Sequence, residues 1–244
     1  MSLRRAAHSG TLGALRGDMQ SIEAGVHLGA LPQLKSLLVE WAEVQSEYAR
    51  AWNWTDVPWW YTERASIGTL AAAAWRLHWV ALEEFSNAKR ASGGTRHATK
   101  NSVGRCDLLV CDRLHDQDYL IEAKEYWPRL RSGPPGNRFS AILSKARTEA
   151  ARVIPHEGAK RLAAVFVTPS IPGSYGHEIE GHLRRYVEWF SGLDRSAVAW
   201  TFPRRARGLT TAKGRTYPGV ILVLRPLRMT RHGARGYTRR PLAE

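Results

Sequence analysis

The sequence predicts an α/β protein with one sizeable core, and three observations support that class. Apolar residues recur at helical spacing before residue 92, and two short apolar runs between Arg105 and Glu125 have the composition of strands. A succession of strand, helix and strand then follows, which is typical of a crossover connection. A chain of 244 residues with 43% hydrophobic content is long enough for such a core, and we expect one domain with basic extensions.

Two helical patterns occupy the first part of the chain. From about Ser21 to Ala51 the apolar residues follow steps of three, one and four, with Pro32 near the start of the pattern. The second pattern begins after Asp56 and Pro58, which suit a capping residue and a first-turn proline, and it continues for roughly 25 residues. We therefore expect residues 1–57 to form a helical extension and a long helix to open the core.

Two apolar runs, CDLLVCD at 106–112 and YLIEAKE at 119–125, predict a β-hairpin that turns near His115 and Asp116. Cys106 and Cys111 lie five positions apart in the first run, so their side chains are expected on opposite faces of the strand. They cannot then bond to each other, and we interpret them as reduced core thiols.

Regular elements are also expected after the Pro/Gly-rich loop at 131–138. The patterns predict a helix from about 139 to 154, a strand at 161–169, a helix at 177–190 and strands at 197–202 and 220–224. We assign residues 58–202 to the core and residues 203–244 to a basic C-terminal segment that includes a strand at 219–224.

The charge balance favours a polyanionic partner. The chain has 36 Lys and Arg against 22 Asp and Glu, a formal net charge of +14, and no acidic residue lies between Asp194 and Glu244. Such an excess attracts nucleic acid, and in this stretch we nominate Arg204, Arg205 and Arg207 as phosphate contacts. The alternative is a solvated basic tail with no specific partner.

Three charged residues of the predicted hairpin are expected to converge. Glu122 and Lys124 are two apart in a strand and share one face, whereas Glu125 should point away from Lys124. Asp107 lies opposite this pair if the sum of paired positions in the hairpin is odd. Two carboxylates in an apolar hairpin repel each other unless a divalent cation neutralises them, and oxygen ligands suit Mg²⁺ or Mn²⁺.

Glu63 is a candidate fourth member of this site. It begins a stripe that continues through Ile67, Leu70, Ala74, Leu77 and Ala81 at steps of four and three along one face of the predicted helix. A carboxylate at the end of an apolar stripe suggests a functional role.

The spacing of these residues resembles the motif of the PD-(D/E)XK nuclease superfamily, which has the restriction-endonuclease-like fold. Cys106-Asp107 is followed, after fourteen residues, by Glu122-Ala123-Lys124, with Cys106 in the place of the name-giving Pro. The resemblance implies a core of helix, antiparallel three-stranded meander, crossover helix and further strand. The first meander strand would lie between Gly94 and Val103.

The same resemblance implies a role for each residue of the site. Asp107, Glu122 and Glu63, with the carbonyl of Ala123, would be metal ligands, and Lys124 would act on the attacking water. A basic residue on the helix after the meander would approach the scissile phosphate. For that role we nominate Lys145, with Arg138 on the same helix as a further contact; the alternative is a solvated helix face.

The expectation is therefore a Mg²⁺- or Mn²⁺-dependent nuclease that hydrolyses DNA phosphodiester bonds, in restriction, phage defence or repair. RNA is the alternative substrate, and a homodimer or partner proteins of a defence or repair system are expected associations. Two other classes stay open: a non-catalytic nucleic-acid-binding or scaffold module on the same fold, and charges that only form surface salt bridges.

No signal core or membrane-spanning segment is expected. The longest apolar run, from Leu70 to Trp75, is far too short to span a bilayer, and the N-terminal residues have no continuous apolar stretch. The prediction is a cytoplasmic protein without a membrane partner.

Overall fold

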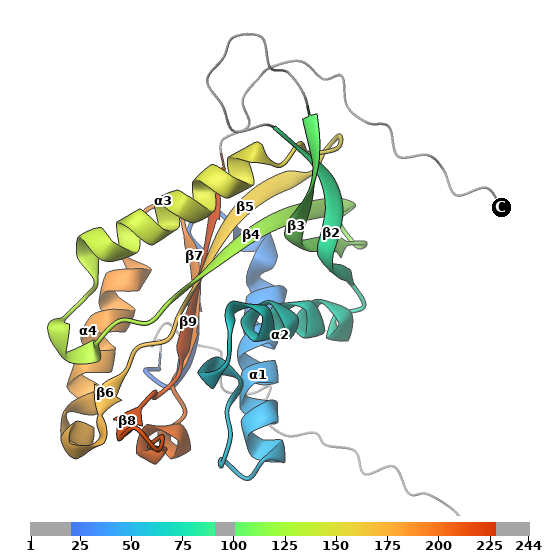
Figure 1. Ribbon diagram of the computed structural model, residues 1–244. Coiled ribbons are helices and arrows are strands. Elements are labelled where there is room, and N and C mark those ends of the chain that lie inside the picture. Colours follow the sequence, from blue (N-terminus) through green and yellow to red (C-terminus); the bar gives the residue numbers. More distant parts are fainter. Residues whose placement is uncertain (1–20, 91–100, 228–244) are drawn as a thin grey trace, which may run out of the picture.

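The computed structural model describes residues 21–90 and 101–227, which form an α/β fold of three layers. A seven-stranded sheet lies in the middle, with α1 (Lys35–Ala51) and α2 (Glu63–Arg76) on one face and α3 (Gly136–Arg152) and α4 (Ile179–Ser191) on the other (Figure 1). Each face of the sheet has its own apolar cluster. The sheet is thus buried on both sides, which explains the long apolar runs in its central strands.

The sheet is mostly antiparallel. Among the strands of the sheet within residues 21–90 and 101–227, only β4 and β5 pair in parallel, since α3 crosses between them. The strand order is β1 (Ala24–His27), β7 (Ala197–Thr201), β9 (Val220–Pro226), β5 (Lys160–Val167), β4 (Gln117–Tyr126), β3 (Asn101–Asp112) and β2 (Val80–Arg90). Two short strands, β6 (Ile171–Pro172) and β8 (Arg215–Thr216), pair separately.

Several predicted elements are confirmed. The predicted hairpin corresponds to β3 and β4, and the predicted crossover helix and strand correspond to α3 and β5. The helical pattern expected from about Ser21 to Ala51 corresponds to α1 in its second part, and the helix expected at 177–190 is α4. The strands expected at 197–202 and 219–224 are β7 and β9. Within the described residues, no helix has the length and apolarity that a membrane crossing requires.

The expected helix of roughly 25 residues after Pro58 is wrong in its second half. The helix ends at Arg76, and His78 takes a left-handed conformation with φ of +60° that turns the chain. Residues 80–90 then form β2, which pairs with β3 over ten positions. The first strand of the meander is thus β2, and its expected place between Gly94 and Val103 is wrong. The apolar spacing from Glu63 to Ala81 extends past the end of the helix. Leu70 on the helix and Ala81 on β2 both pack into the same apolar cluster, so the pattern does not distinguish the two elements. Tertiary pairing overrides local propensity here.

The two segments expected as extensions both contribute to the sheet. Residues 24–27, placed in a helical extension by the sequence, form the edge strand β1, where Gly25 lies against the ring of Trp200. A Cβ on Gly25 would come within 2.4 Å of that ring, so the strand can pack there only with glycine. β9, from the basic C-terminal segment, lies between β5 and β7. The arginines after residue 227 lie outside the described residues.

β3 changes face at Asp107. Cys106 packs with Cys111 and Leu120 in one apolar cluster, whereas Leu108 belongs to the cluster under α1 and α2. The β2–β3 ladder also skips the position of Glu84 and Asp107, and Glu84 has φ of +51°. The register is the same on both sides of the gap, so the two strands are distorted locally without an inserted residue. The two cysteines are free thiols as predicted, but they lie on the same face, so the expectation of opposite faces is wrong.

Candidate active site

The candidate site lies where β4 separates from β3. The last pair between the two strands is Leu108 with Ile121, while β4 continues to Tyr126 with β5 as its strand partner. This register has the odd sum that the prediction required, and its extension would place Asp107 opposite Glu122. In the described part of the chain, residues 122–126 of β4 therefore have an edge without a strand neighbour, where backbone groups need other partners.

The side chains of the predicted site residues bind this open edge. Asp107 Oδ2 accepts a hydrogen bond of 2.8 Å from the backbone N–H of Ala123, and Lys124 Nζ donates one of 2.8 Å to the carbonyl of Ala123. The Glu63 carboxylate, at the start of α2, accepts a hydrogen bond from the backbone N–H of Glu125. The structure thus brings together Asp107, Glu122, Ala123, Lys124 and Glu63.

Glu122 is a buried carboxylate that is paired with a lysine from two strands away. Its side chain is 2% exposed, and its Oε1 lies 2.7 Å from Lys89 Nζ of β2. Burial raises the pKa of Glu122 to about 7; Lys89 lowers it and the neighbouring charge of Asp107 raises it further. The ammonium of Lys89 thus favours the ionised form of Glu122 and opposes the effect of burial.

Lys124 is held by a carboxylate from the crossover helix. Its Nζ lies 2.6 Å from Oε2 of Glu149 on α3. Burial would lower the pKa of Lys124, but the surrounding carboxylates, Glu149 first among them, raise it above its usual value. Lys124 is consequently a cation at neutral pH. Glu122 and Lys124 are paired with Ala163 and Val165 of β5, which belong to the apolar cluster under α3 and α4. Both therefore lie on the α3 side of the sheet, and they share one face as strand parity predicted.

Glu125 joins β4 to the first residue of α2. As expected, it does not share the environment of Lys124: its carboxylate accepts hydrogen bonds from the backbone N–H of Glu63 and from the side chain of Trp127. Glu63 and Glu125 therefore each bind the other's backbone. Burial raises the pKa of both carboxyls, that of Glu125 to about 7, and the charge of Asp107 adds to the effect at Glu63.

The other nominated residues lie around this centre in different settings. Lys145 is exposed on α3, one turn before Glu149 on the same side of the helix, and Arg138 is exposed near the start of α3, where its charge acts on Tyr126. Arg204 pairs with Glu23 and Arg207 with Glu180, each at 2.6 Å, whereas Arg205 is exposed. Arg207 also donates to the carbonyl of Phe202, so it stabilises the chain that follows β7.

Two residues of the site, Lys89 and Glu149, were missed by sequence reasoning. Lys89 lies in the segment expected to be helical, so no pattern could place it beside Glu122. Glu149 lies four residues after Lys145, and a helical repeat of 3.6 puts both on one side of the helix. The face chosen for Lys145 could therefore have indicated Glu149 as well.

A divalent cation suits the chemistry of these donors. Four carboxylates, from Glu63, Asp107, Glu122 and Glu149, surround two ammonium groups, from Lys89 and Lys124. Burial is the main reason why the pKa values of Glu63 and Glu122 are raised, and the negative charge of Asp107 adds to the effect at both. As arranged, with Asp107 on Ala123 and Glu122 on Lys89, the described residues present no group of three His, Cys, Asp or Glu side chains that could hold a metal ion.

Comparison of the chain with family models, with curated proteins and with solved structures found no match. The geometry itself offers carboxylate oxygens, a backbone carbonyl and an oriented ammonium group at one open strand edge. Oxygen donors of this kind bind hard divalent cations, and an ammonium group beside them can bind a phosphate oxygen or a water molecule. That combination suits hydrolysis of a phosphodiester.

Proposed function

We propose that this protein is a metal-dependent nuclease that hydrolyses DNA phosphodiester bonds, on a restriction-endonuclease-like core and in a defence or repair setting. The observation that carries the proposal is the meeting of Asp107, Glu122, Lys124 and Glu63 at the point where β4 leaves β3. These residues come from a helix and two strands that are separated in the sequence. Surface charges that meet by chance would not be expected to bind one open strand edge together.

The order of elements around the site supports the family resemblance. α2 precedes the antiparallel strands β2, β3 and β4, and α3 then crosses to β5, which is parallel to β4. This is the order of helix, meander, helix and strand that the Asp107, Glu122 and Lys124 motif implies. The remaining strands β1, β7 and β9 extend the sheet beyond β5.

The proposed chemistry assigns each group one task. Asp107, Glu122, Glu63 and the carbonyl of Ala123 would hold Mg²⁺ or Mn²⁺, which when bound polarises a phosphoryl oxygen and acidifies water. Lys124 has three donor protons, of which Ala123 O and Glu149 Oε2 take two. The third is then directed by these two contacts and can orient the attacking water or bind a phosphate oxygen.

A non-catalytic nucleic-acid-binding module is the second candidate, and one observation favours it. Both lysines of the site have carboxylate partners within the chain, Lys89 with Glu122 and Lys124 with Glu149. The charged groups of the site therefore largely neutralise one another, as in a site that has a structural role. Such a module would bind DNA with a steep salt dependence and would retain that binding after replacement of Glu122 or Lys124.

Cleavage assays separate the two candidates. Purified protein is incubated with plasmid, linear duplex, single-stranded DNA and RNA in Mg²⁺, Mn²⁺ or EDTA, beside Lys124→Ala and Asp107→Ala. We expect cutting that needs the metal and falls at least about 100-fold in both variants. Lys35→Ala and Glu157→Gln, at exposed positions, are the matched controls and should cut normally. Salt-sensitive binding without cutting under any metal condition would refute the nuclease and favour the binding module.

A further inference from the structure

An exposed tryptophan follows β4 directly beyond the candidate site. Trp127 is 39% exposed although it is fixed on two sides. Its side chain is hydrogen-bonded to the carboxylate of Glu125, and its ring meets that of Tyr217 edge to face, with 5.4 Å between centroids and an interplanar angle of 87°. The indole is thus held in one orientation while more than a third of the residue faces solvent.

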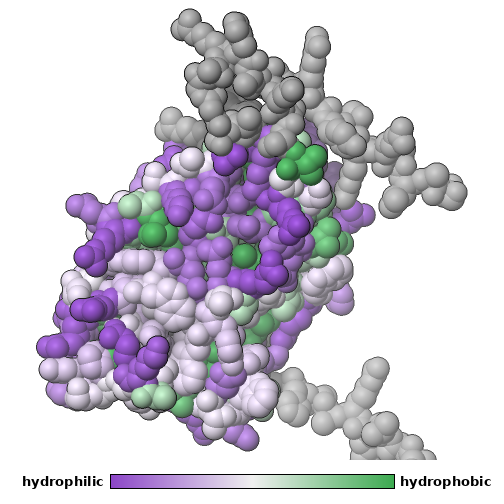
Figure 2. Space-filling view, in the orientation of Figure 1, coloured by the Kyte–Doolittle hydropathy of each residue, from purple (hydrophilic) through white to green (hydrophobic). Residues whose placement is uncertain are grey.

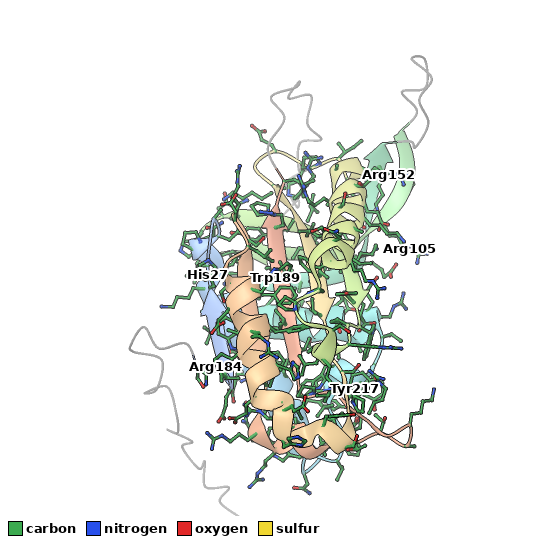
Figure 3. All side chains as sticks on the ribbon, turned by 90° about the vertical axis from the view of Figure 1, so that its left-hand side faces the viewer. His27, Arg105, Arg152, Arg184, Trp189 and Tyr217 are labelled. Atoms are coloured by element: carbon green, nitrogen blue, oxygen red, sulfur yellow. The ribbon has the colours of Figure 1, made fainter. Side chains whose placement is uncertain are left out.

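Tyr217, which packs against Trp127, is hydrogen-bonded to a residue of the core. The backbone carbonyl of Tyr217 accepts a hydrogen bond of 3.0 Å from Nε1 of Trp59, which is 1% exposed. Figure 3 shows where Tyr217 lies, near one end of the molecule and away from Arg152 and Arg105. A rigid aromatic side chain loses little conformational entropy when it binds a ligand, so this arrangement is suited to a stacking contact.

Two exposed arginines, Arg129 and Arg138, follow this tryptophan in the sequence. Within residues 21–90 and 101–227, neither forms an ion pair. Burial raises the pKa of Tyr126, and the charge of Arg138 lowers it, so this guanidinium lies close to the residue that precedes Trp127. Arg131, by contrast, pairs with Glu178 and stacks on Tyr175. The unpaired arginines are free to bind phosphates.

A protein partner that binds through apolar contacts is the alternative to a nucleotide, and the face in Figure 2 does not favour it. On the face shown in Figure 2, apolar residues form small separate areas among hydrophilic ones. Such scattered areas are ordinary for a protein surface, whereas partner docking sites are usually contiguous. An exposed aromatic ring with exposed arginines close to it in the chain is instead a combination that suits single strands, with bases on the ring and phosphates on the cations.

We propose that Trp127 is a base-stacking platform and that Arg129 and Arg138 bind the neighbouring phosphates, so that the site takes single-stranded or unpaired DNA. The inference rests on the proposed function, because that function determines where the DNA strand lies. Trp127 is three residues beyond Lys124, directly after the end of β4 and within about 10 Å along the chain, so a nucleotide at the site can place a nearby base on the indole. In an intact duplex the base faces are covered by their neighbours, so stacking on Trp127 requires an unpaired base.

Binding without cleavage tests this proposal. The affinities of fluorescein-labelled dT20 and of a 20-base-pair duplex are measured by anisotropy in EDTA, for the full chain and its variants. Wild type should bind dT20 more tightly than duplex, and Trp127→Ala should weaken dT20 binding about 5- to 100-fold while duplex binding changes little. Arg129→Ala and Arg138→Ala should weaken binding to both DNAs and each reduce the salt slope by about one.

Control variants keep the result interpretable. Trp127→Phe preserves the ring without the indole N–H and should retain most dT20 affinity, whereas Trp75→Ala removes an exposed indole on α2 and should have no effect. Equal dT20 affinity of Trp127→Ala and wild type, or a wild-type preference for duplex, would overturn the inference. Because EDTA excludes metal-dependent cutting, this failure is distinct from failure of the nuclease proposal, which only the cleavage assays detect.

Discussion

Lys89 Nζ lies 2.7 Å from Glu122 Oε1, although β3 separates the strands of the two residues. The lysine stem reaches across β3 over Gly104: a Cβ there would come 2.7 Å from Lys89 Cδ and 2.9 Å from Cγ. Gly104 thus leaves the space through which Lys89 reaches the site. Since Glu122 is 2% exposed, this ammonium is a principal source of compensation for a buried carboxylate.

Replacement of Lys89 with methionine should destabilise the protein. Lys89→Met keeps most of the aliphatic stem but removes the ammonium, which leaves the buried Glu122 without its ion-pair partner. We expect the free energy of unfolding in urea at pH 8 to fall by about 2–4 kcal/mol. The matched control is Arg64→Met, which removes an exposed ion pair with Glu84 and should cost under about 1 kcal/mol. Equal losses in the two variants would show that Lys89 does not compensate Glu122.

A side chain at position 104 should displace the Lys89 stem. Gly104→Ala in the wild-type background places its methyl group against Cγ and Cδ of Lys89 and should destabilise by about 1–3 kcal/mol. In a Lys89→Ala background the stem is gone, so the same substitution should cost little. A double-mutant cycle measures this coupling, and strictly additive losses would mean that the two positions do not interact.

The centre of the fold and most of the site could be predicted because their signals are local. Glu122 and Lys124 share a face through strand parity, and the register of β3 and β4 follows from a turn near His115 and Asp116. Glu63 was indicated by helical spacing. These inferences need only the sequence neighbours of each residue.

The parts that escaped prediction depend on contacts between distant segments. Residues 80–90 fit a helical pattern, and only pairing with β3 makes them a strand and brings Lys89 to Glu122. The change of face at Asp107 breaks the alternation that had separated Cys106 from Cys111. Neither this local distortion at Glu84 and Asp107 nor the space above Gly104 has a pattern that could be predicted from one strand alone.

The buried carboxyl of Glu125 should make stability fall as pH rises. Its pKa is raised by burial from its usual 4.5 to about 7 in the folded protein. Below about pH 4.5 the carboxyl is protonated in both states and its contribution to stability is fully present. Between pH 4.5 and 7 the unfolded chain loses the proton first, so that contribution is progressively lost. Glu122, with a pKa raised to the same value, acts in the same direction.

Glu125→Gln should flatten this dependence. The amide cannot ionise, yet its oxygen can still accept a hydrogen bond from the backbone N–H of Glu63. Wild type should lose on the order of 3 kcal/mol more than the variant between pH 5 and pH 8, as measured by urea unfolding at each pH. Glu157→Gln, at an exposed position, should follow wild type. A variant whose stability falls as steeply as wild type would contradict the assigned burial of Glu125.

Mg²⁺ or Mn²⁺ should stabilise the folded protein, because a cation beside Asp107 and Glu122 offsets charge that Lys89 and Lys124 leave uncompensated. A ligand that binds only the folded state at ten times its dissociation constant adds about 1.4 kcal/mol, which differential scanning fluorimetry detects as a rise in Tm. Asp107→Asn should abolish that rise, whereas Glu157→Gln should retain it in full. Na⁺ at equal ionic strength controls for general screening of the +14 charge. If both metals raise the Tm of Asp107→Asn as much as that of wild type, the cation binds elsewhere and Asp107 is not its ligand.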